Sequence, residues 1–269
     1  MFPYAIVFSD LDGTLLDAAH RLTPRTREAV RALCAQGVPF VPVSARGPSG
    51  IAPLCRELGL GPGPLVACGG ALVFGRAGEI LFSRGMDRET AAQAQALCAA
   101  RGAAACLYAG EDWLAPDPDD PRVRREEEIV CARARRGGAA DLAAGAPVHK
   151  VLAICDGSEQ ADALEREARE RLPLCNVARS SPILLEIMAR GVDKGAAVQR
   201  VCAHLGVSTS RALAFGDGWN DREMLEAVGF PTVMENAPEA LRARFPRRGP
   251  RNDGDGVACV LEALLRAAE

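Results

Sequence analysis

Two aspartates near the start of the chain, Asp10 and Asp12, have the residue type and spacing that metal-assisted chemistry needs. They follow the apolar run 4–8, which is typical of a strand buried on both faces of a parallel sheet. Carboxylates two residues apart on extended backbone point to the same side and repel each other. We therefore expect a cation to hold them, and Mg²⁺, which prefers oxygen ligands, is the natural candidate. Gly13 allows a sharp turn at the end of this strand, where open parallel sheets bind ligands.

Ser44 and Lys194 also lie at the ends of predicted elements. Ser44 ends the predicted strand 38–43, where its hydroxyl could donate to a phosphate oxygen, although a lone serine there is more often part of a turn or cap. Lys194 precedes a predicted helix, where its charge opposes the helix dipole. A site that contains carboxylates and phosphate explains this lysine better than a structural role does.

Asp217, Asn220 and Asp221 follow the predicted strand 212–215 in the pattern Gly-Asp-x-x-Asn-Asp. Asp217 can ligate Mg²⁺. Helix capping would explain one of the other two residues but hardly the whole pattern. An Asp-Gly pair after a strand is often only part of a turn. Here the pairs Asp12-Gly13 and Asp217-Gly218 both follow predicted strands, and neither stands alone.

Together these residues meet the needs of phosphoryl transfer through an aspartate. That reaction needs a carboxylate nucleophile, an acid/base group, a divalent cation and donors around the phosphoryl oxygens. The chain offers a candidate for each, always at the end of a predicted strand or helix.

Alternating strands and helices at both ends of the chain predict an α/β fold with a doubly wound, Rossmann-like parallel sheet. The middle of the chain mixes strands and helices differently, which indicates an inserted α+β domain. Pro39 and Pro42 are awkward in a central strand, and 116–121, with three prolines, should be irregular. Strands are predicted at 4–9, 38–43, 65–68, 71–74, 79–83, 103–108, 150–155, 174–179, 183–188, 212–215 and 230–234, and helices at 24–36, 48–58, 87–101, 158–171, 194–205, 224–228 and 256–267.

Composition excludes several classes of function. The 269 residues carry a net charge of −3 without a basic stripe, so we expect no nucleic-acid partner. No apolar run reaches the roughly 18 residues of a membrane span, and the chain begins directly with a strand rather than a signal peptide. The ten cysteines form no C-x-x-C pair, which argues against zinc and disulfides and for a cytoplasmic protein.

The motifs around these residues resemble those of the haloacid dehalogenase superfamily, in its Cof-like branch. The apolar strand followed by Asp-x-Asp-Gly-Thr is similar to the first motif, and Ser44-Ala45-Arg46 stands where Thr-Gly-Arg is common. Lys194-Gly195 and the Asp217 segment resemble the third and fourth motifs. Segments 235–239 and 252–258 are weaker matches. An insertion between Ser44 and Lys194 corresponds to a C2-type cap.

The resemblance implies a catalytic core at 1–84 and 189–269 and a cap at 85–188 that selects the substrate. It implies a phosphatase in which Asp10 attacks phosphorus and Asp12 acts as acid and base. Mg²⁺ would be held by Asp10, the backbone carbonyl of Asp12 and Asp217, with Asp221 supporting this shell. The phosphate-binding groups would be Ser44, Lys194, Asn220 and the backbone N–H of Leu11, while Arg46 would reach the phosphate or an acidic neighbour.

Several alternatives stay open at this stage. The substrate would be a small phosphomonoester such as a sugar phosphate, but the chain could also be a phosphomannomutase-like phosphotransferase, or a sucrose-phosphate or mannosyl-3-phosphoglycerate phosphatase. A phosphometabolite sensor is the non-enzymatic alternative. No membrane partner is expected, and the protein is expected to be a monomer or homodimer. The histidines, His20, His149 and His204, have no metal-ligand spacing, and we expect them to be structural, with His149 not facing the cleft between cap and core.

Overall fold

The computed structural model describes residues 3–268, and its main sheet has five parallel strands. The strand order is β14-β13-β12-β1-β2. The first strand of the chain therefore lies inside the sheet, between β2 and the strand that precedes Asp217. The strands are β1 (Ile6–Ser9), β2 (Phe40–Pro42), β12 (Ala212–Gly216), β13 (Phe230–Met234) and β14 (Arg248–Gly249).

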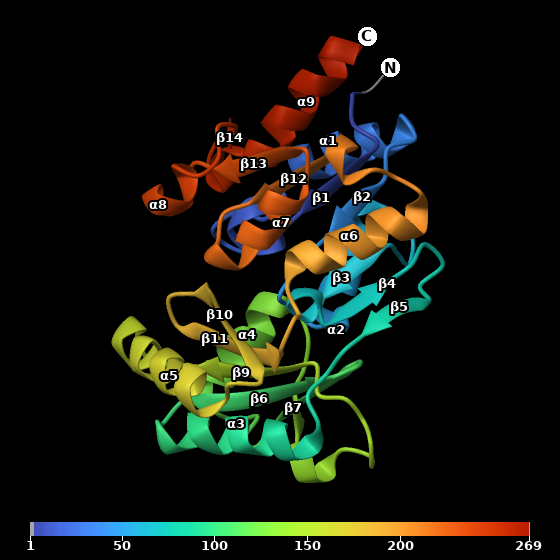
Figure 1. Cartoon of the computed structure of the whole chain (residues 1–269). Coiled ribbons are helices and arrows are strands. Elements are labelled where there is room, and N and C mark those ends of the chain that lie inside the picture. The colour runs from blue at the N-terminus through green and yellow to red at the C-terminus, as the bar shows by residue number, and fades with distance from the viewer. Residues whose placement is uncertain (1–2, 269) are drawn as a thin grey trace.

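Helices cover both faces of this sheet, as Figure 1 shows. Successive side chains of β1 enter two different cores: Val7 packs in one, and Ile6 and Phe8 pack in the other. This two-sided burial explains why the strand is apolar throughout, and it confirms the doubly wound α/β prediction. The covering helices are α1 (Pro24–Ala35) and α9 (Gly256–Ala268) on one face and α6 (Lys194–Leu205) and α7 (Arg222–Ala227) on the other.

The prolines around β2 are tolerated because this strand is at the edge of the five-stranded sheet. Regular pairing ends at Pro42, and Val43 then forms a single bridge to Val66. Val66 belongs to a separate antiparallel sheet of β3 (Leu65–Ala67), β4 (Leu72–Phe74) and β5 (Ile80–Ser83). The helix α2 (Pro48–Leu58) lies between these segments in the chain.

The middle of the chain forms its own α+β domain, drawn below the main sheet in Figure 1. Its six strands have the order β10-β11-β9-β6-β7-β8, and α3 (Arg88–Ala100) and α5 (Ser158–Arg171) pack on the sheet. The strands are β6 (Ala104–Ala109), β7 (Asp112–Ala115), β8 (Arg135–Arg136), β9 (Lys150–Ile154), β10 (Cys175–Ser181) and β11 (Leu184–Ala189). The inserted α+β domain predicted from the sequence is therefore present.

One local prediction is wrong. Pro121 was expected in an irregular stretch, but it is the first residue of α4 (Pro121–Val130). Asp120 caps this helix by accepting a hydrogen bond from the Arg122 N–H at 2.8 Å, and proline is favourable at the first position because it needs no hydrogen-bond acceptor there. Within residues 3–268, no helix combines the length and the apolar character that crossing a bilayer requires.

Candidate active site

Asp10 and Lys194 meet at the carboxyl edge of the main sheet. Asp10 follows β1, and Lys194 is the first residue of α6, whose N-terminus is capped by Asp193. The Lys194 Nζ lies 2.5 Å from Asp10 Oδ1 and 2.5 Å from Asp221 Oδ1. Burial would lower the pKa of Lys194, but the charges of Asp10 and Asp221 raise it above its usual range, so the ammonium stays protonated. These two ion pairs explain a lysine at a helix N-terminus, where the dipole disfavours it.

Three carboxylates gather around this lysine. Oxygens of Asp10, Asp217 and Asp221 all lie within 4.8 Å of one another. Burial and the charge of Asp221 raise the pKa of Asp10 well above its usual range, against the effect of Lys194. The same two causes raise the pKa of Asp217 to about 7. One lysine leaves excess negative charge, so the donor set fits a divalent cation with oxygen ligands.

The turn after β1 is shaped to bring Asp217 close. Gly13 has a φ of +81°, and a Cβ at this position would lie 2.4 Å from Asp217 Oδ2. Thr14 donates its hydroxyl hydrogen to Asp217 Oδ1 at 2.6 Å. Asn236 donates to Asp217 Oδ2 at 3.3 Å and to the Gly13 carbonyl at 2.8 Å. Asp217 is therefore held in place by the same loop that carries Asp10 and Asp12.

The Asp12 carboxylate lies outside the cluster of Asp10, Asp217 and Asp221, contrary to the expectation that the carboxylates of Asp10 and Asp12 point to the same side. The backbone leaves the extended conformation within the turn, and Asp12 contacts Arg46 and His20 instead. Burial would raise the pKa of Asp12, but hydrogen bonds from His20 and Arg46, with the charge of Arg46, hold it well below its usual range. Of the two roles expected for Arg46, this geometry shows the contact with an acidic neighbour.

The remaining predicted phosphate-binding residues come from several loops. Ser44 is buried, and its Oγ accepts a hydrogen bond from the Arg46 N–H at 3.1 Å. The side chain of Leu11 is fully buried, so this residue can meet a ligand only through its backbone. Asn220 is half-buried and lines a cavity together with Lys194.

Sequence reasoning missed several of the supporting residues. Thr14 and Asn236 belong to matched motifs, but nothing in their spacing predicted a contact with Asp217. His20 was expected to be structural, yet its Nδ1 lies 2.8 Å from Asp12 Oδ1. Its backbone φ of +57° is unusual for a residue other than glycine. The one sequence feature that hints at this contact is the position of Asp12, eight residues before His20.

A cavity of about 380 Å³ lies between the inserted domain and these loops. It brings Lys194 and Asn220 together with Glu186 and Met188, both from β11. Met188 lies directly over Gly69, since a Cβ on that glycine would be 2.9 Å from the methionine sulfur. The inserted domain thus forms one wall of the site.

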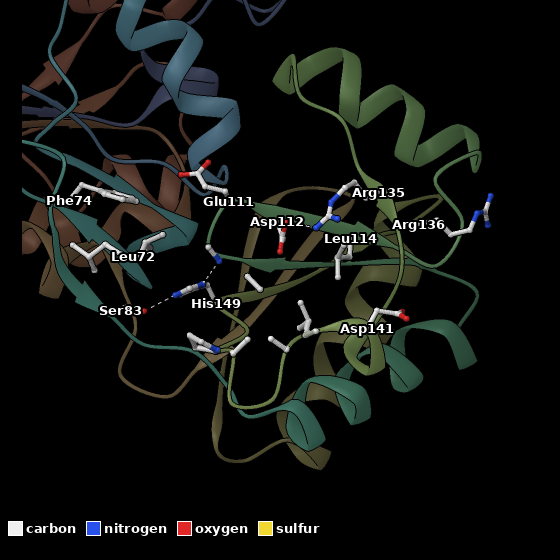
Figure 2. Close-up of a pocket in the computed structure, with 17 residues that line it drawn as sticks. Leu72, Phe74, Ser83, Glu111, Asp112, Leu114, Arg135, Arg136, Asp141 and His149 are labelled. Carbon is white, nitrogen blue, oxygen red and sulfur yellow. Dashed lines mark hydrogen bonds and ion pairs between the residues drawn. The ribbon is translucent and has the colours of Figure 1, made fainter.

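A second cavity, of about 440 Å³, lies at another part of the interface between the two domains, and Figure 2 shows the residues that line it. His149 joins the two domains there. Its Nε2 lies 2.9 Å from Ser83 Oγ of β5, and its Nδ1 accepts a hydrogen bond from the Gly110 N–H at 2.9 Å. Burial lowers the pKa of His149, which agrees with a neutral ring that accepts at Nδ1. His149 therefore faces the interface, contrary to expectation, at a distance from the carboxylate cluster.

Comparison with known proteins agrees with this arrangement. The family model for haloacid dehalogenase-like hydrolases matches residues 7–261. A "Putative phosphatase" of Haemophilus influenzae is 33% identical over 260 residues, which cover 96% of this chain and 97% of that protein. An HMP-PP phosphatase of Cronobacter sakazakii is 30% identical over 246 residues, covering 88% of this chain and 86% of the other.

Solved structures share the whole fold. A haloacid dehalogenase-like hydrolase from Bacteroides thetaiotaomicron has a TM-score of 0.85 and 26% identity, covering 97% of this chain and 99% of the other. A HAD subclass IIB sugar phosphatase has the same fold, with a TM-score of 0.79 at 22% identity over 96% of this chain and 98% of the other. Fold and relatives define a phosphatase, an enzyme that acts on small phosphate substrates. The chain belongs to the haloacid dehalogenase-like hydrolases, in the Cof-like branch with an inserted cap.

Proposed function

We propose that this enzyme is a Mg²⁺-dependent phosphatase that hydrolyses a small phosphomonoester, such as a sugar phosphate or a similar metabolite, through an aspartyl phosphate on Asp10. The observation that carries the proposal is the position of Asp10. It lies at the end of a central strand, 2.5 Å from the Lys194 ammonium and within the cluster of Asp217 and Asp221. A carboxylate that attacks a charged phosphate needs cations nearby, which Lys194 and a metal ion held by the carboxylate cluster would supply.

In the first step, an Asp10 carboxylate oxygen attacks phosphorus, and the bond between phosphorus and the leaving oxygen breaks. Asp12 gives its proton to the leaving oxygen. In the second step, the ionised Asp12 takes a proton from water, the resulting oxygen attacks phosphorus, and the acyl-phosphate P–O bond breaks. Inorganic phosphate leaves, and Asp10 is again a carboxylate.

The cation would be held by Asp10, Asp217 and the backbone carbonyl of Asp12, with Asp221 fixing the surrounding shell. When bound, Mg²⁺ would neutralise charge on the phosphoryl oxygens and on the carboxylate cluster. Asp221 already accepts hydrogen bonds from the N–H groups of Asp217 and Gly218 at 3.0 and 2.9 Å. It is therefore placed to orient the loop that presents Asp217.

Phosphate oxygens would be bound by Lys194 and by donors from the loops around it, which are Ser44, Asn220 and the backbone N–H of Leu11. The contact of Asp12 with Arg46 favours the ionised carboxylate, which is the form that the second step needs. The first step needs the protonated form, so a bound substrate must weaken that contact.

We further propose that residues 1–84 and 189–269 act as the catalytic core and 85–188 as the substrate-selecting cap. The cap contributes Glu186 and Met188 to the 380 Å³ cavity, where the leaving group would lie. This volume suits a small metabolite better than a polymer.

The test is phosphate release from a panel of phosphorylated metabolites, with Mg²⁺ and with EDTA, for the native enzyme and for Asp10→Asn. Mg²⁺-dependent release that disappears in the folded variant supports the proposal, and the ranking of compounds names the substrate class. Transfer of phosphate to a second metabolite instead of water would identify a mutase. A native enzyme that binds Mg²⁺ but releases no phosphate from any compound would contradict the proposal.

A further inference from the structure

The cap touches the catalytic core through a buried ammonium group. Lys150 is the first residue of β9, and only 2% of its surface is exposed. Its Nζ donates a hydrogen bond to the backbone carbonyl of Ala45 at 2.5 Å. Ala45 stands between Ser44 and Arg46, so the contact reaches the loop that carries both groups. No step of the proposed reaction uses Lys150.

The carbonyls of this loop are bound from two different domains. The Ser44 carbonyl accepts from the Gly69 N–H at 2.9 Å, and the Arg46 carbonyl accepts from the Cys68 N–H at 2.8 Å. Both donors belong to the core. The Ala45 carbonyl between them is bound by Lys150 of the cap. The middle carbonyl of the loop is therefore bound by the cap, while its two neighbours are bound by the core.

Two cap residues hold the ammonium in this position. Glu186 Oε1 lies 3.5 Å from Lys150 Nζ, and both side chains are buried. The Nζ also lies 4.4 Å from the centre of the Tyr108 ring, a favourable distance for a cation–π contact. That ring packs against the same loop, because a Cβ on Gly47 would lie 2.8 Å from Tyr108 Cδ1. Buried polar groups are costly unless they are bonded, and these contacts meet that need for Lys150.

The loop in turn controls Asp12. Arg46 leaves the loop and binds both carboxylate oxygens of Asp12, while the Arg46 N–H is bonded to Ser44 Oγ. A displacement of the Ala45 carbonyl would move the attachment points of both side chains. Misplacing a catalytic group by about 1 Å can cost about a hundredfold in rate.

We propose that Lys150 is a positioning residue that couples closure of the cap to the geometry of Ser44, Arg46 and Asp12. When the cap is closed, the ammonium fixes the Ala45 carbonyl. It thereby sets the positions of Ser44, the phosphate donor, and of Arg46, the partner of Asp12. The inference rests on the proposed phosphatase function. It predicts that Lys150 affects the hydrolysis of every substrate rather than of one.

The kinetic test compares Lys150→Met with Lys150→Arg, using the best metabolite from the panel and p-nitrophenyl phosphate. Methionine matches the lysine side chain up to Cε but lacks the nitrogen that donates, so kcat should fall at least tenfold for both substrates, with KM changed less than threefold. Arginine can still donate and should recover part of kcat. Arg171→Met removes an exposed cation of the cap, which is paired with Glu167, and should leave kcat unchanged.

A second measurement does not depend on activity. Hydrogen–deuterium exchange of the substrate-free protein should be faster in Lys150→Met than in the native enzyme for peptides that cover 43–50, and unchanged for α9. Equal exchange in this loop would overturn the proposal. So would a loss of kcat/KM confined to the metabolite, because Lys150 would then be a substrate contact. If the native enzyme hydrolyses nothing, the proposed function fails, and the exchange data alone still decide whether Lys150 orders the loop.

Discussion

Arg46 binds both carboxylate oxygens of Asp12: its Nε lies 2.7 Å from Oδ2, and its Nη2 lies 2.6 Å from Oδ1. Such a two-point contact fixes the plane of the carboxylate as well as its distance, which a lysine cannot do. The Arg46 side chain is 5% exposed and that of Asp12 is 35% exposed, so water reaches the pair mainly from the Asp12 side and screens it in part.

Replacing Arg46 with lysine should therefore lower kcat even though the charge is kept. We expect a loss of about ten- to a hundredfold, because general acid–base catalysis depends on the orientation of Asp12. The measurement is steady-state kinetics with the best substrate of the panel. Arg27→Lys, on the exposed surface of α1, serves as the control for the same chemical change. Equal kcat values for native enzyme and Arg46→Lys would contradict this role.

His20→Asn tests the second contact of Asp12. Asparagine tolerates the left-handed backbone that His20 adopts, so the substitution removes the ring with little strain. We expect a smaller loss of kcat than for Arg46→Lys, since one hydrogen bond is removed and the two-point contact remains. A loss larger than that of Arg46→Lys would make His20 the main support of Asp12.

Asp217→Asn should separate two consequences of the carboxylate cluster, which are the destabilisation of the metal-free fold and the binding of Mg²⁺. Burial and Asp221 raise the pKa of Asp217 to about 7, so above that pH its charge destabilises the metal-free fold. With EDTA at about pH 8, the free energy of unfolding of the variant should be higher, by an amount on the order of 1 kcal/mol, so the variant should melt at a higher temperature. Millimolar Mg²⁺ should stabilise the native enzyme but not the variant. A native melting temperature that does not respond to Mg²⁺ would argue against the cation site.

Gly13→Ala and Gly37→Ala form a matched pair. Both glycines have positive φ, +81° and +78°, so alanine costs about 1 kcal/mol or more of backbone strain at each site. A Cβ at Gly13 also collides with Asp217, whereas the space around Gly37 is open. Chemical denaturation should show a larger loss for Gly13→Ala, and only this variant should lose activity. Equal losses would mean that the turn can shift away from Asp217.

His149 should make the stability of the closed molecule depend on pH. Because burial lowers its pKa in the folded state, the unfolded chain binds the proton more readily. The contribution of His149 is therefore complete above its unfolded pKa of about 6.5 and is lost as pH falls below that value. Urea unfolding between about pH 7.5 and 5 should show a steeper decline for the native enzyme than for His149→Gln. Parallel declines would exclude this effect.

The residues that could be predicted from the sequence are those whose position follows from topology alone. Asp10 and Asp217 follow strands that are neighbours in a parallel sheet, so their carboxylates had to meet at one edge. Lys194 could be predicted because its charge conflicts with its place on a helix. Local patterns were sufficient in these cases because the sheet supplies the long-range geometry.

Contacts that depend on side-chain direction could not be predicted. The spacing of Asp10 and Asp12 suggested one shared cation, but the backbone leaves the extended conformation at Leu11, between them, and the two carboxylates contact Lys194 and Arg46 respectively. The sequence predicted Lys150 as the first residue of an apolar strand, and nothing local indicated that its side chain contacts Ala45 in the core. Such contacts depend on how the cap sits on the core, which no local pattern records.

The chain passes between core and cap only twice within the described residues, after β5 and after β11, and its first and last elements both belong to the core (Figure 1). In protein-engineering terms, the cap is a cassette that recombination could exchange without touching the catalytic strands. Such exchanges must preserve the contact between the cap and the Ala45 carbonyl of the core. A grafted cap would need its own donor at the place of Lys150, or the chimaera would bind new substrates and process them slowly.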